Sequence, residues 1–176
     1  MYIGVAAYSE EPDKQLVEKS YSFLGELRFR CGDVRLVVGG YWGLMRYVVD
    51  RALDLGFTVV ILPPVEREHV VFPERAIVIR TGLTFRARSV SLARTSDVLV
   101  VLGGGAGSLQ ELVTAHAEGK PVYVLVGTGY PTDVVETWPE YLDARMLAPL
   151  KKVRDPVELA RQVCDELRRR GYQGWG

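Results

Sequence analysis

The feature that most constrains the fold is the stretch VLVVLGGGAGSLQE, in which an apolar run leads directly into glycines and then into a helical pattern. Residues 98–101 are all valine or leucine and are followed by Leu102, which is typical of a strand covered on both faces. Strands of that kind belong to parallel sheets, whose crossover connections are usually helices. The stretch therefore predicts an α/β fold with a central strand at residues 97–102.

The glycines that follow this strand predict a site for an anion. Because glycine has no Cβ atom, a ligand can lie directly on the main-chain amides that begin the next helix, where the helix dipole is positive. Ser108 can cap that helix or donate its hydroxyl group to an oxyanion, and Glu111 stands one turn further on. A purely structural turn is the alternative. The predicted phosphate-binding residues are Gly103, Gly104, Gly105, Ala106, Gly107 and Ser108.

The same loop excludes two common classes of nucleotide-binding protein. No Lys follows the last glycine, so the GxxxxGK[ST] motif of P-loop NTPases is absent. The dinucleotide fingerprint should follow the first strand, but there the chain reads AAYSEE.

Strand and helix patterns alternate along the rest of the chain, which indicates a mostly parallel sheet with helices on both faces in one domain, residues 1–176. No structure is assigned to residues 127–149, and the tail at residues 171–176 is expected to be loose. Strands are predicted at residues 2–7, 34–38, 57–62, 76–79, 97–102 and 121–126. One helix is predicted to follow the polar turn at residues 11–13 and to end near Cys31, and a second to follow the glycine-rich corner at residues 39–45 and to end at Gly56. Further helices are predicted at residues 83–95, 109–118 and 155–170.

Composition narrows the function classes. Lys plus Arg and Asp plus Glu both number 22, so the net charge of zero disfavours a dedicated nucleic-acid or membrane-surface binder. Cys31 and Cys164 lie far apart without metal-ligand spacing, so we expect buried thiols, no disulfide and no metal site. The chain has no basic leader and no apolar run of membrane-spanning length, which predicts a cytoplasmic protein.

In a parallel sheet, ligands bind along the edge where the strands end. The loops that follow the predicted strands should therefore converge there, together with Arg88 at the start of a helix. Trp42 could stack on a base, although packing is the commoner role of such a residue. The further predicted ligand-binding residues are Tyr8, Ser9, Gly39, Gly40, Trp42, Gly43, Met45, Gly127 and Thr128.

Two helices predict self-association. The helix at 83–95 has apolar residues on two sides, which usually means two packing partners. In the helix at 109–118, the sheet-facing set is expected to include Val113, which turns Glu111 outward. We therefore predict a homodimer, or a higher homo-oligomer, that packs through both helices with Glu111 near the contact.

At this point the residues resemble a known family. GGGAGSLQE is similar to the PGGxGTxxE signature of the proteins long labelled "possible lysine decarboxylase", which include the LONELY GUY phosphoribohydrolases. GGYWGLM resembles that family's GGGxxGLM corner, and Arg88 stands where the family has the Arg of an Arg-Lys pair. The resemblance implies a Rossmann-like fold, a nucleotide phosphate on the glycine loop, and Arg88 and Glu111 as catalytic residues.

Three departures from the motifs favour one branch of the family. Leu102 replaces the motif Pro, Ser108 replaces Thr, and Ser89 replaces the Lys next to Arg88. The pattern is closer to the branch related to DprA and to the molybdenum-cofactor carrier protein. No lysine suits a Schiff base with pyridoxal phosphate, so we do not expect a lysine decarboxylase.

The resemblance leads to three hypotheses. The first is hydrolysis of the N-glycosidic bond of a nucleoside 5′-monophosphate, which gives base and ribose 5-phosphate without a required cofactor. The second is a non-catalytic carrier for a nucleotide or a phosphorylated cofactor such as the molybdenum cofactor. The third, a nucleic-acid module, is disfavoured by the zero net charge. A purely structural pair of Arg88 and Glu111 is also possible.

Overall fold

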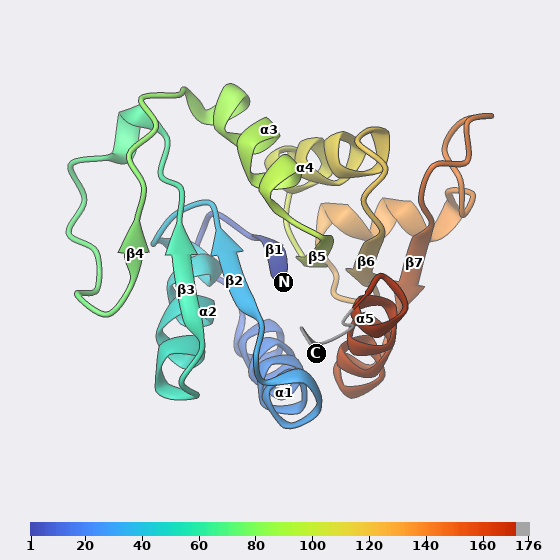
Figure 1. Cartoon of the computed structure of the whole chain (residues 1–176), viewed down its shortest axis with the longest axis horizontal. Coiled ribbons are helices and arrows are strands. Elements are labelled where there is room, and N and C mark those ends of the chain that lie inside the picture. The colour runs from blue at the N-terminus through green and yellow to red at the C-terminus, as the bar shows by residue number, and fades with distance from the viewer. Residues whose placement is uncertain (172–176) are drawn as a thin grey trace.

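The computed structural model describes residues 1–171 and shows a seven-stranded parallel sheet with helices on both faces (Figure 1). The strand order is β4-β3-β2-β1-β5-β6-β7, which confirms the predicted Rossmann-like α/β class. The loose tail predicted at residues 171–176 lies, except for Gly171, outside the described residues. The strands are β1 (Tyr2–Ala7), β2 (Arg35–Val38), β3 (Thr58–Ile61), β4 (Ile77–Val78), β5 (Val98–Leu102), β6 (Val122–Leu125) and β7 (Leu150–Val153).

The strand order creates a switch point between β1 and β5. The chain builds outward from β1 to β4 and then returns to place β5 against the other side of β1. Ala7 pairs with Leu102, so the two strands end level with each other. The chain then leaves β1 and β5 toward opposite faces of the sheet, and this divergence opens a crevice in which α/β proteins bind ligands.

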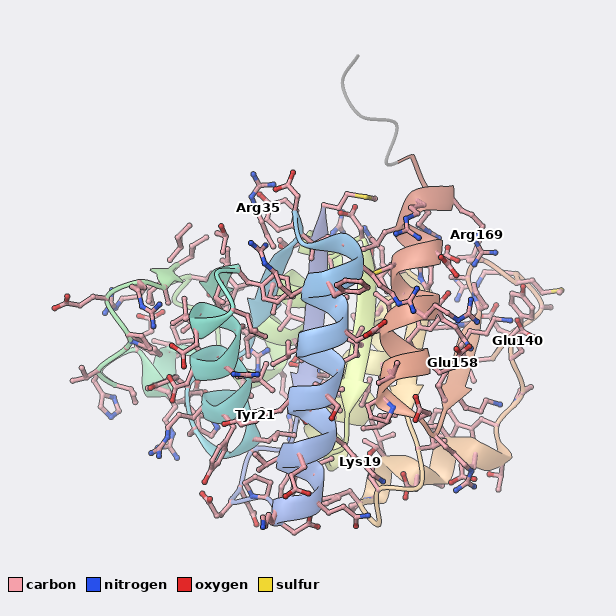
Figure 2. All side chains as sticks on the ribbon, turned by 90° about the horizontal axis from the view of Figure 1, so that it is seen from below. Lys19, Tyr21, Arg35, Glu140, Glu158 and Arg169 are labelled. Carbon is pink, nitrogen blue, oxygen red and sulfur yellow. A yellow bond between two sulfur atoms is a disulfide. The ribbon has the colours of Figure 1, made fainter. Side chains whose placement is uncertain are left out.

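The helices form two layers. α1, α2 and α5 cover one face of the sheet, and α3 and α4 cover the other (Figure 1). Figure 2 shows α1 between α2 and α5. Among residues 1–171, no helix combines the length and the apolar character needed to cross a membrane. The helices are α1 (Lys14–Cys31), α2 (Gly43–Asp54), α3 (Phe85–Thr95), α4 (Ala106–Ala117) and α5 (Pro156–Arg169), with 3-10 turns η1 (Val65–Arg67) and η2 (Pro131–Thr137).

Alternation along the central strand explains why its sequence is apolar throughout. Val100 packs into the core beneath α1, α2 and α5. Leu99 and Val101 pack into the core beneath α3 and α4. Both faces of β5 are therefore buried, as the run of valine and leucine predicted.

The two largest differences from the sequence prediction concern α4 and β7. Helix α4 begins at Ala106 rather than Leu109, because the Gly105 carbonyl already accepts the Leu109 N–H (3.1 Å). Strand β7 was not predicted, because its apolar signal is reduced to Leu150 and Val153 on either side of two lysines. Lysines are common on edge strands, where they discourage pairing with other chains.

The cysteine prediction was wrong. Cys31 at the end of α1 and Cys164 on α5 form a disulfide, with their Cα atoms 5.8 Å apart and a sequence separation of 133. Sequence spacing gave no sign of this pair, because it depends on α1 and α5 packing side by side on one face of the sheet (Figure 2).

Candidate functional site

A cavity of about 590 Å³ lies at the switch point, where β1 and β5 end. This volume is within the range of small-molecule sites, roughly 300–1,000 Å³. Its walls come from the loop after β1, the start of α2, η1, and the N-terminal parts of α3 and α4. The predicted convergence of loops at this edge therefore produces a hollow of ligand size.

The start of α4 forms one wall of the cavity. The first intrahelical hydrogen bond of α4 is donated by Leu109, so the amides of Ala106, Gly107 and Ser108 have no acceptor within the helix. Gly105 is the N-cap residue and supplies no side-chain cap. Asp13 caps α1 and Asp155 caps α5, whereas α2 and α3 begin, like α4, without a side-chain cap. The cavity wall thus presents N–H groups and the positive end of a helix dipole.

The glycines of this loop divide into two groups. A Cβ atom at Gly104 would meet the Ser108 hydroxyl at 2.1 Å, and Gly104 has φ +148°, which only glycine adopts easily. A Cβ atom at Gly105 or Gly107 would meet no protein atom within 4 Å. Gly104 is therefore required by the fold itself, whereas Gly105 and Gly107 border open space in the cavity wall.

Arg88 of α3 and Glu111 of α4 form an ion pair inside this wall. Arg88 Nη1 donates to Glu111 Oε1 at 2.5 Å, and each residue is only 6% exposed. The Ser89 hydroxyl donates to the same oxygen at 3.3 Å. Burial raises the pKa of the Glu111 carboxyl group, and the Arg88 charge together with the two hydrogen bonds opposes that rise.

Arg88 is held in place by the backbone beneath it. A Cβ atom at Gly39 would come within 2.3 Å of Arg88 Nη1, so glycine lets the guanidinium group lie against the end of β2. The buried Arg88 Nε has no hydrogen-bond partner among the described residues. The pairing with Glu111 is therefore the main electrostatic compensation of this buried cation.

Aromatic rings gather at the part of the cavity formed by α2, η1 and α3. Trp42 and Phe85 lie edge to face with ring centroids 6.3 Å apart, and the Arg67 guanidinium lies 5.5 Å from the Trp42 ring. Tyr8 packs edge to face on Tyr130 at 4.8 Å. The cavity thus combines amides, a buried ion pair and flat apolar surfaces.

The predicted site residues fall into two sets. Those that line the cavity are Tyr8, Ser9, Trp42, Met45, Arg88, Gly105, Ala106, Gly107, Ser108 and Glu111. Those placed outside its lining are Gly39, Gly40, Gly43, Gly103, Gly104, Gly127 and Thr128. Their predicted part in ligand binding would therefore be indirect.

Several residues of the second set shape their neighbours. Gly43 has φ +52°, and a Cβ atom there would come within 2.5 Å of the Glu10 carbonyl oxygen, so α2 starts directly against the loop after β1. The Thr128 hydroxyl donates to Asp133 at 2.9 Å, and the Gly127 carbonyl accepts from Lys19 at 3.0 Å. Gly43 therefore supports the loop after β1, which lines the cavity, whereas Gly127 and Thr128 support the loop at residues 127–133, which lies outside the lining.

The sequence prediction missed some residues of the cavity lining and placed the Glu111 side chain on the wrong side of its helix. Glu111 faces Arg88 in the interior, whereas Val113 is 45% exposed, so the predicted outward orientation of Glu111 was wrong. The helical period allows both assignments, and the buried arginine on α3 decides between them. The lining residues that were not predicted are Ala7, Glu10, Glu66, Thr84, Phe85, Arg86 and Ser89. Most of them lie in loops or helix starts without a motif.

Comparisons with known proteins show which sequences and folds this chain resembles. An uncharacterized protein of Archaeoglobus fulgidus is 33% identical over 123 residues, which are 69% of this chain and 78% of that protein. The X-ray structure of TM1055 has a TM-score of 0.78 at 30% identity and covers 94% of this chain and 98% of its own. The molybdenum cofactor carrier protein of Chlamydomonas reinhardtii has a TM-score of 0.75 at 26% identity and covers 95% and 98%.

The family follows from the span of the match. The family model described as "SLOG cluster4 family" matches residues 1–156, which include the whole cavity and every strand of the sheet. The suspected relationship to LONELY GUY and DprA-like Rossmann proteins is thereby confirmed, and the chain belongs to the SLOG cluster4 family.

Proposed function

We propose that this chain binds a phosphorylated small molecule with a flat ring, either a nucleotide or a phosphorylated pterin-type cofactor, and carries it without consuming it. The observation that carries this proposal is the start of α4, where the amides of residues 106–108 face a cavity of about 590 Å³. Backbone N–H groups and the helix dipole together favour phosphate at such a position. The ring would lie against Trp42 and Phe85.

Two further observations favour a carrier. The similar protein from Chlamydomonas reinhardtii is named a molybdenum cofactor carrier protein. In this chain Ser89 stands beside Arg88 and binds Glu111, so the cation that a Lys would place next to Arg88 is absent. The cavity lining has no Cys or His. The amides and aromatic rings fit the phosphate and ring of such a cargo, and the Met45 thioether is the only soft group among the lining residues that the structure describes.

A second candidate is hydrolysis of a nucleoside 5′-monophosphate, and the Arg88–Glu111 pair favours it. Glu111 lines the cavity with one carboxylate oxygen held by Arg88 and Ser89. The other oxygen could orient a water molecule or stabilise an oxocarbenium-like ribose. In that reaction the water oxygen bonds to C1′, the C1′–N bond breaks, and the base leaves with a proton.

Binding at α4 is tested by calorimetry on Gly107→Ala. A helical Cβ atom tilts toward the N-terminus, so the new methyl group would obstruct a phosphate on the amides while touching no protein atom within 4 Å. AMP should bind the variant about tenfold more weakly, which is the loss of roughly one charge-assisted hydrogen bond.

The matched control is Gly25→Ala. Gly25 also lies in a helix, and a Cβ atom there also has no neighbour within 4 Å, but it is in α1 and does not line the cavity. Both variants should be slightly more stable than the original chain, because alanine favours helix. Equal AMP affinity in both variants would contradict a phosphate-binding site at the start of α4.

The two candidate functions are separated by the fate of the ligand. A carrier returns AMP, GMP and related monophosphates intact after prolonged incubation, whereas a hydrolase releases free base that chromatography detects. If base appears, Glu111→Gln should abolish its release and leave nucleotide affinity nearly unchanged. Base release by the original chain would remove the carrier proposal and leave the hydrolase.

A further inference from the structure

The aromatic part of the cavity holds a carboxylate that the phosphate site does not use. Glu66 belongs to η1, and η1 is tied to the approach to α3 by the Val65 N–H, which donates to the Leu83 carbonyl at 2.8 Å. The next residue, Arg67, places its guanidinium group 5.5 Å from the Trp42 ring. Glu66 is exposed and lines the same cavity as Trp42 and Phe85.

Glu66 differs from the other two carboxylates of the cavity. Glu10 accepts the Tyr8 hydroxyl at 3.0 Å, and Glu111 is paired with Arg88. The Glu66 carboxylate makes no hydrogen bond and no ion pair with another residue in the part of the chain that the structure describes. It is the cavity carboxylate with both oxygens available to a ligand.

A carboxylate sets a strict requirement on what it touches. It only accepts hydrogen bonds and repels phosphate, so its partner must be the ring of the ligand rather than its phosphate. Two adjacent N–H groups on one edge of a flat ring match its two oxygens. A 2-amino-4-oxo ring, as in guanine or a pterin, has such an edge in its ring N–H and its amino group.

Other rings satisfy this requirement less well. Hypoxanthine keeps the ring N–H but lacks the amino group. Adenine places an unprotonated ring nitrogen beside its amino group, which would set one acceptor against another. Glu66 is exposed, so water can replace a missing donor, and the discrimination against such rings is limited to the net strength of one charge-assisted hydrogen bond.

We propose that Glu66 selects a 2-amino-4-oxo ring, so that the ligand of this cavity is a guanine nucleotide or a phosphorylated pterin. This inference rests on the proposed function and narrows its ligand class. Trp42 and Phe85 supply the apolar surface for the ring, and the start of α4 holds the phosphate. Glu66 accepts hydrogen bonds from the N–H groups on the edge of the ring.

The test is calorimetry with GMP, IMP, AMP and neopterin phosphate on the original chain and on Glu66→Gln. GMP or neopterin phosphate should bind about tenfold more tightly than IMP, and the tighter of the two identifies the natural class. Glu66→Gln should bring the ratio of affinities close to one, because its amide N–H₂ opposes one donor of the ring. Glu74→Gln, an exposed position outside the cavity, should leave the ratio unchanged.

The outcomes separate this inference from the proposed function. If no nucleotide, neopterin phosphate or inorganic phosphate binds, the proposed function fails and the selection fails with it. If the phosphorylated ligands bind with equal affinity, or if the preference persists in Glu66→Gln, only the role of Glu66 is overturned. A preference for a 2-amino ligand that disappears in Glu66→Gln but not in Glu74→Gln supports it.

Discussion

The site is built around a buried ion pair, in which each charge compensates the burial of the other. Arg88 and Glu111 are each 6% exposed, and neither charge could be removed from water without the other. The pair joins α3 to α4 directly behind the start of α4. It therefore serves the fold as well as any chemistry that takes place in the cavity.

Replacing Arg88 should show how much the ion pair contributes to the free energy of unfolding. Arg88→Met leaves the Glu111 carboxyl group buried without its cation, so the free energy of unfolding should fall by about 3–5 kcal/mol. Arg86→Met, at an exposed position on the same helix, should change it by less than about 0.5 kcal/mol. Urea denaturation of both variants measures the difference, and equal stability would mean that the buried pair contributes nothing.

Among the elements, α5 has two carboxylates that form hydrogen bonds in its first turns, those of Asp155 and Glu158. Asp155 accepts the Glu158 N–H at 2.7 Å, and the Glu158 side chain accepts from Arg161 at 2.6 Å and from Gln162 at 2.7 Å. These hydrogen bonds lower the pKa of Glu158 to about 2. Figure 2 shows Glu158 on α5.

This pKa predicts a pH dependence of stability. Because the pKa is lower in the folded than in the unfolded chain, the contribution of Glu158 is present above the ordinary glutamate pKa of about 4.5 and disappears as the pH falls toward about 2. Glu158→Gln should lower the melting temperature slightly at pH 7 and leave it unchanged near pH 2. A difference that grows on acidification would contradict this assignment.

The elements also show how far sequence reasoning reaches. The apolar run at residues 98–102 predicted a buried central strand at residues 97–102, and the structure has this strand at residues 98–102. The lining residue Glu66 could not be predicted, because its position depends on η1 packing beside α3 through the Val65–Leu83 hydrogen bond. The motif-bearing half of the cavity was thus predictable, and the half built by tertiary packing was not.

For the whole molecule, the Cys31–Cys164 disulfide joins the first helix to the last across 133 residues. Closing so long a loop removes freedom from the unfolded chain, and chain-entropy estimates give about 5 kcal/mol. Reducing agent should therefore lower the melting temperature of the original chain. The double variant Cys31→Ala/Cys164→Ala should already melt at the lower temperature and should not respond to reductant; equal melting of oxidised and reduced protein would contradict a stabilising role.

Association through α3 and α4 is a second prediction at this scale. Val90 of α3 is 38% exposed and Val113 of α4 is 45% exposed, so both helices present apolar side chains outside the core. We expect a homodimer by analytical ultracentrifugation at micromolar concentration. Val90→Asp/Val113→Asp should shift it to monomer, and a monomeric original chain would refute the prediction.

Whether phosphate lies on the start of α4 is tested most directly by a proton–nitrogen NMR titration with GMP. The backbone amides of Ala106, Gly107 and Ser108 should show the largest shifts and saturate together, because they would donate to the phosphate. Saturating GMP that leaves these three signals in place, or that moves only signals outside the cavity, would contradict a phosphate-binding function for this chain.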